Sequence, residues 1–128
     1  MYQAQKHYRS LSIASRIEAA SPHELVAILY EELLRALDVT RTALAQGKGE
    51  ACRSARERSS AILLALEGSL DFEAGGELAR NLSGVYRSMQ KQLAASVQSG
   101  DAHKLEVVRA CVADLLSAWA RIRVREAA

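Results

Sequence analysis

The sequence is poor in the residues that break helices. Its 128 residues include one proline, seven glycines and six aromatic residues (one Trp, four Tyr and one Phe). Alanine, leucine, arginine, serine and glutamate are the most frequent residues, and most of these are good helix formers. The alternating pattern of a β-strand is absent. The composition therefore excludes a turn-rich β protein, and the length is that of one domain.

The chain also has few cysteines and no long apolar run. Cys52 and Cys111 are far apart in helix-patterned segments, which excludes a disulfide framework and a cysteine-based metal site and predicts free thiols. The N-terminal residues lack the apolar core of a signal peptide. No apolar run of about 18 residues could span a membrane. We therefore expect a cytoplasmic protein without membrane insertion.

Charge of one sign is not in excess, because the net charge is +2. Arginines cluster at residues 53–58 and 121–126, but no aromatic residue is interleaved with them. A solvated helix face and a charged helix C-terminus explain these clusters. We expect no nucleic-acid partner.

Catalytic groups are equally scarce. The three histidines, His7, His23 and His103, lie in the N-terminal tail or in first helical turns and form no Glu-x-x-His pair at metal-site spacing. No phosphate loop, dinucleotide fingerprint or nucleophile motif occurs. The sequence predicts a protein that is not an enzyme, with no catalytic residues, no metal site and no cofactor.

Apolar side chains recur every three or four residues in four segments, about 22–45, 50–70, 77–98 and 102–123. The first begins with a predicted helix cap: Ser21 and Glu24 can form a capping box, and Pro22 suits the first helical position. Gly47 is predicted to end this helix, and Asp101 to cap the fourth. Residues 71–76 have the composition of a loop.

Helices of similar length with short connections predict an all-α fold, an antiparallel up-down four-helix bundle over residues 21–128. Residues 1–20 form a separate tail, which carries more apolar groups than a flexible tail usually has. We expect this tail to dock on the bundle as a cap through Tyr8, Leu11, Ile13 and Ile17.

The first helix carries a surplus of apolar side chains. On a helical projection they fill an arc of about 180°, whereas one buried face needs only a little over 100°. The outer edge, mainly Tyr30, Leu34 and Leu37, is predicted to face a partner such as another helix. Two alternatives stay open at this point: the helix is simply the most buried of the four, or the tail covers it.

Four stretches resemble one known family in their order along the chain. They are Tyr8, then ASPHELVAILYEELL at residues 20–34, then LDFEAGGELARNLSGVYRSM at residues 70–89, and LLSAWARI at residues 115–122. Together they resemble the flagellar secretion chaperone family FliS. The chain departs from the family after the tyrosine of the first helix, where Glu31 and Glu32 replace a common Asp-Gly pair.

The resemblance implies a cytoplasmic export chaperone. Such a chaperone binds the disordered C-terminal segment of flagellin, prevents premature polymerisation, and delivers flagellin to the flagellar type III secretion system. The cytoplasmic domain of the export gate is a second expected partner, and the tail can occupy part of the client groove. The alternative is a helical adaptor for a different secreted or regulatory client, and the oligomeric state is open. The expected client-binding residues are Leu25, Leu29, Tyr30, Leu34, Leu37, Leu82 and Tyr86.

Overall fold

The structure is a computed structural model that describes residues 13–127, with side chains described for residues 13–122. A short N-terminal helix covers residues 13–19. Four long helices follow: α2 (Pro22–Ala45), α3 (Gly49–Gly68), α4 (Phe72–Ser99) and α5 (Ala102–Ala127). The described residues contain no strand, and the expected all-α class is confirmed.

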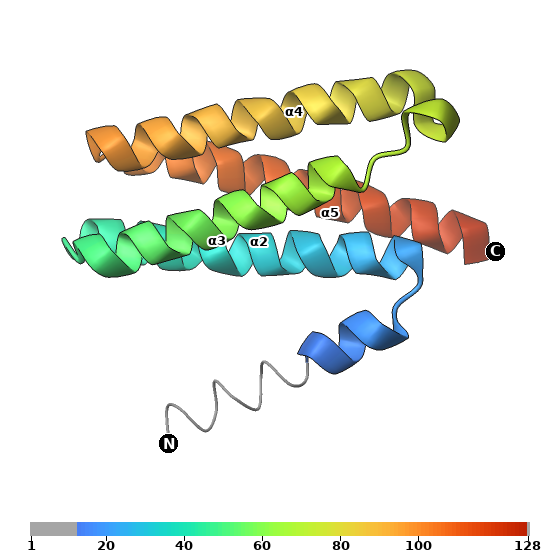
Figure 1. Ribbon diagram of the computed structural model, residues 1–128, viewed down its shortest axis with the longest axis horizontal. Coiled ribbons are helices and arrows are strands. Elements are labelled where there is room, and N and C mark those ends of the chain that lie inside the picture. The colour runs from blue at the N-terminus through green and yellow to red at the C-terminus, as the bar shows by residue number, and fades with distance from the viewer. Residues whose placement is uncertain (1–12, 128) are drawn as a thin grey trace.

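Successive long helices run in opposite directions (Figure 1). Helix α2 packs against α3 and α5, and α4 packs against the same two helices. All four contribute to one apolar core, whose buried members are Tyr30, Leu33, Ala36, Leu37, Ile62, Leu63, Leu66, Tyr86, Met89, Leu93, Leu105, Val108 and Val112. Three buried hydroxyls, on Thr40, Ser59 and Ser96, each donate to a main-chain carbonyl of their own helix, so the core contains them without an unpaired donor.

The predicted helix ends agree with the observed hydrogen bonds. The Oγ of Ser21 accepts from the Glu24 amide at 3.1 Å, which is one half of the expected capping box, and Pro22 occupies the first turn. Gly47 has φ 69°, and the amide of Lys48 donates to the Ala43 carbonyl at 2.9 Å. A left-handed glycine followed by this bond is the usual helix stop.

The predicted loop over residues 71–76 is wrong. Asp71 caps α4, because its Oδ1 accepts from the amides of Glu73 and Ala74 at 3.0 Å each. The chain is thus helical from Phe72, and the irregular point is Gly76 alone, with φ 50° and ψ −124°. These angles suit glycine only, so α4 consists of one capped turn, a kink and a long helix.

Candidate protein-binding site

Three of the predicted client-binding residues lie inside the core. Tyr30, Leu37 and Tyr86 are 2%, 1% and 2% exposed. The prediction that Tyr30 and Leu37 form an outward-facing edge of the first helix is therefore wrong. The surplus apolar arc is instead buried by α3 on one side and α5 on the other, since α2 packs against both. Client contact by these residues stays a prediction.

The two tyrosines are buried together because each satisfies the polar tip of the other. Their hydroxyl oxygens are 2.6 Å apart, joining α2 to α4 across the core. Burial raises the pKa of Tyr86 well above its usual range and also raises the pKa of Tyr30. Both phenols therefore stay neutral at physiological pH. A periodicity argument could not find this pair, because the two residues are 56 positions apart.

The other predicted residues lie nearer the surface. Leu25, Leu29, Leu34 and Leu82 are partly buried, and the last three pack against the core with one side only. Leu82 also lies one helical turn after Leu78, whose side chain is exposed.

The predicted tail residues are only partly within the described chain. Tyr8 and Leu11 lie outside it, Ile13 is partly buried, and Ile17 is 42% exposed. The short helix reaches α2 through Arg16, whose guanidinium donates to the Glu31 carboxylate at 2.9 Å.

The two glutamates that depart from the family pattern both make ion pairs. Glu31 binds Arg16 of the short helix. Glu32 is 5% exposed and contacts Arg35 at 2.9 Å and Arg58 of α3 at 3.4 Å. These two positions therefore attach α2 to the N-terminal segment and to α3.

A strip of incompletely covered apolar side chains follows the seam between α4 and α5. We call it the α4–α5 strip. Its members are Leu78, Leu82 and Val85 on α4 and Leu115, Trp119 and Ile122 on α5. Spacings of four and three residues place the members of each helix on one face.

Exposure rises along this seam with distance from the turn that joins the two helices. Because α4 and α5 are antiparallel, residues equally distant from that turn face one another. Near the turn, Leu93 and Val108 are each 1% exposed, whereas Leu78 and Ile122 at the far end are 59% and 39% exposed. Figure 1 shows the two helices separating toward that far end. The apolar side chains of the seam are therefore less completely covered at that end.

The α4–α5 seam also lacks polar cross-links among the side chains that the structure describes. Each of the other three seams is crossed by an ion pair: Glu32–Arg58, Asp38–Arg109 and Glu67–Arg87, at 3.4, 2.6 and 2.9 Å. Separating α4 from α5 thus breaks apolar contacts without unpairing a described charge. The apolar face of an added helix can replace such contacts, whereas it cannot replace an ion pair.

Trp119 fastens the far end of α5 to the start of α2. Its Nε1–H donates to the carbonyl of His23 at 2.9 Å, and the two rings stack with centroids 4.4 Å apart and an interplanar angle of 14°. Trp119 is thus partly a core residue and partly a member of the strip.

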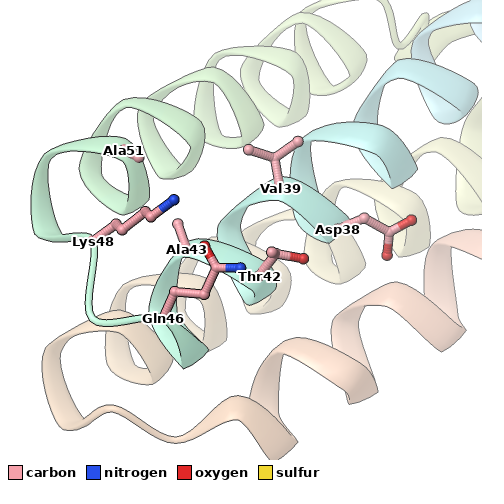
Figure 2. Close-up of a pocket in the computed structure, with 7 residues that line it drawn as sticks. All are labelled: Asp38, Val39, Thr42, Ala43, Gln46, Lys48 and Ala51. Carbon is pink, nitrogen blue, oxygen red and sulfur yellow. The ribbon is translucent and has the colours of Figure 1, made fainter.

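A hollow lies between the end of α2 and the start of α3 (Figure 2). It measures about 340 Å³ and is lined by Asp38, Val39, Thr42, Ala43, Gln46, Lys48 and Ala51. Its Asp38 is already bonded to Arg109 of α5. The hollow therefore offers an apolar wall around Val39, which is 55% exposed, but no converging polar groups that would define a small-molecule site.

No group of three or more metal-ligating side chains occurs within the described residues. In the same part of the chain, no helix is both long and apolar enough to cross a bilayer. An incompletely covered apolar strip of this kind matches the apolar face of an amphipathic helix.

The comparisons with known proteins give the family. The sequence model of the family described as flagellar protein FliS matches residues 4–126, and the chain belongs to this family. The flagellar secretion chaperone FliS of Salmonella typhimurium is 36% identical over 121 residues, which cover 91% of this chain and 87% of the relative. The protein of the same name from Vibrio cholerae is 31% identical over 119 residues, covering 90% and 85%. The flagellar secretion chaperone FliSB of Pseudomonas aeruginosa is 31% identical over 116 residues, covering 91% and 92%.

Proposed function

We propose that this protein is a flagellar export chaperone that binds the disordered C-terminal segment of flagellin. It prevents premature polymerisation of flagellin and delivers it to the cytoplasmic domain of the flagellar export gate. The proposal places the protein in the cytoplasm and assigns it no enzymatic activity, no cofactor and no nucleic-acid partner. Family membership and the names of the three relatives support this role.

The observation that carries the proposal is the α4–α5 strip. A disordered client segment that folds into an amphipathic helix can bury large apolar side chains, each contributing about 1.5–3 kcal/mol when fully covered. Leu78 and Ile122 are the most exposed members, and the seam contains no described ion pair that the client must break. We assign the first contacts of the client to this end of the seam.

The residues predicted from the sequence have two roles in this proposal. Leu82 is a direct contact within the strip, and Leu25, Leu29 and Leu34 are further contacts on α2, since all four are only partly buried. Tyr30, Leu37 and Tyr86 form the layer beneath the contact surface. In the free protein, the four-helix bundle is partly covered by its N-terminal segment, including Ile13 and Ile17, which the client displaces.

Calorimetric titration with a peptide of the flagellin C-terminal segment from the same genome tests the proposal. We expect Leu78→Glu to weaken binding at least about tenfold, because it places a charge in the apolar contact. Leu64→Glu is the matched control: Leu64 is 60% exposed against 59% for Leu78, but it lies on α3, outside the strip. Its affinity should stay within about twofold of the unmodified protein.

Two results would contradict the proposal. If the unmodified protein binds none of the flagellins of its cell, the client is wrong, and a stoichiometric partner other than flagellin would establish the helical adaptor instead. If the peptide binds but Leu78→Glu and Leu64→Glu weaken it equally, the strip is not the site.

A further inference from the structure

The contact between His23 and Trp119 joins two regions that the proposed function uses separately. Trp119 belongs to the α4–α5 strip, one turn after Leu115 and one turn before Ile122. His23 lies in the first turn of α2, two residues after the cap residue Ser21. The chain before Ser21 leads directly into the short helix over residues 13–19. One ring pair thus lies between the client strip and the attachment of the N-terminal segment.

This contact carries an energetic penalty in the arrangement observed. The Nε2 atom of His23 is buried and has no hydrogen-bond partner, the one such side-chain atom found among the described residues. A buried polar atom without a partner destabilises the arrangement that buries it. The stacking and the hydrogen bond from the indole, at 2.9 Å, act against that cost. Opening the contact would let water reach Nε2. The free-energy difference between the closed and the open contact is therefore small.

We infer that the His23–Trp119 contact is a latch through which occupation of the α4–α5 strip releases the N-terminal segment. A client helix that enters the seam displaces the Trp119 ring from His23. The first turn of α2 then loses this contact with α5. Because residues 13–20 lead directly into that turn, their position becomes less fixed and the ion pair between Arg16 and Glu31 weakens. The inference rests on the proposed function for the identity of the client, but the latch itself can be tested without one. Coupling is reciprocal, so opening the latch also favours client binding.

The first experiment uses the fluorescence of Trp119, which is the only tryptophan of the chain. The full-length protein is titrated with the flagellin peptide, any Trp in the peptide being replaced by Phe. Trypsin cleavage after Arg16, identified by mass spectrometry, is followed in parallel. We expect the emission change and the faster cleavage to share the midpoint measured by calorimetry. Binding by calorimetry with unchanged Trp emission would overturn the latch and leave the proposed function intact.

The second experiment needs no client, so it separates failure of the latch from failure of the proposed function. His23→Ala removes the stack and should speed cleavage after Arg16 about fivefold, the factor that corresponds to about 1 kcal/mol. His23→Phe keeps a ring and removes the unpaired nitrogen, so it should slow cleavage. Val107→Ala, on the exposed side of α5, is the control and should leave the rate unchanged.

Opposite effects of the two His23 variants would establish the latch, because a merely structural role predicts faster cleavage in both. Faster cleavage in both variants, or no difference between His23→Ala and Val107→Ala, would overturn it. Circular dichroism of each variant confirms that it is folded. Should His23→Ala not fold, Trp119→Phe takes its place, since it removes the donated hydrogen bond but keeps an aromatic ring, and the same faster cleavage is expected.

Discussion

Tyr30 and Tyr86 place two hydroxyl groups in a core that is otherwise largely aliphatic. Burial of the two hydroxyls is tolerated because one donates a hydrogen bond to the other, with the oxygens 2.6 Å apart, so neither oxygen lacks a partner. Its position links α2 to α4, two helices that do not otherwise share a main seam. A buried polar pair of this kind contributes less to stability than to a unique arrangement of the helices, because mismatched packing would leave both hydroxyls unpaired.

This account predicts strong non-additivity between the two tyrosines. Tyr30→Phe or Tyr86→Phe alone leaves one buried hydroxyl without its partner and should lower the free energy of unfolding by about 1–3 kcal/mol. The double Phe variant should lose less than the sum of the two single changes. Urea unfolding of the four proteins measures the coupling free energy. Additive effects would mean that the hydroxyls find other partners and that the pair does not fix the helices.

At the scale of the helices, the sequence predicts most of the features that depend on neighbouring residues in the chain, such as helix caps and helix ends. The cap at Ser21, the stop at Gly47 and the existence of the four long helices follow from short-range rules, because each depends on residues close together in the chain. The first turn of α4 does not follow from the sequence, because residues 71–76 have the composition of a loop although Asp71 caps the helix. The burial of Tyr30 and Leu37 on α2 does not follow from the sequence for a different reason. Which side of a wide apolar arc is covered depends on neighbouring helices, and a single-helix projection does not contain them.

The kink in α4 gives a second prediction at this scale. Gly76→Ala should lower the free energy of unfolding by about 1–2 kcal/mol, because φ 50° is strained for a residue with a Cβ. Gly84→Ala in the same helix is the control: Gly84 is exposed, helical, and has no atom within 4 Å of an added Cβ. It should stabilise the protein by about 0.5–1 kcal/mol. Thermal and urea unfolding measure both. Equal effects of the two changes would mean that α4 is straight in solution.

At the scale of the whole molecule, the four seams differ in how they are held. Three seams combine apolar packing with an ion pair, and the α2–α5 seam has the stacked rings of His23 and Trp119 as well. The α4–α5 seam has apolar packing alone among the described side chains, and its packing weakens away from the Gly100 turn. Exposed ion pairs add little energy individually, but separating the helices that they join breaks them. The α4–α5 seam is therefore the one along which separation unpairs no described ion pair, and we expect opening to begin there.

Native-state hydrogen exchange tests this gradient across the molecule. Amides in the first half of α4 and the second half of α5 should exchange at least about tenfold faster than amides in the halves next to Gly100, because their apolar cover is incomplete. Helices α2 and α3 provide the internal control, since an ion pair crosses their seam. The flagellin peptide should slow exchange selectively in the fast halves of α4 and α5. If all four helices exchange at the same rate, or if the peptide protects α3 instead, opening is global or another seam admits the client.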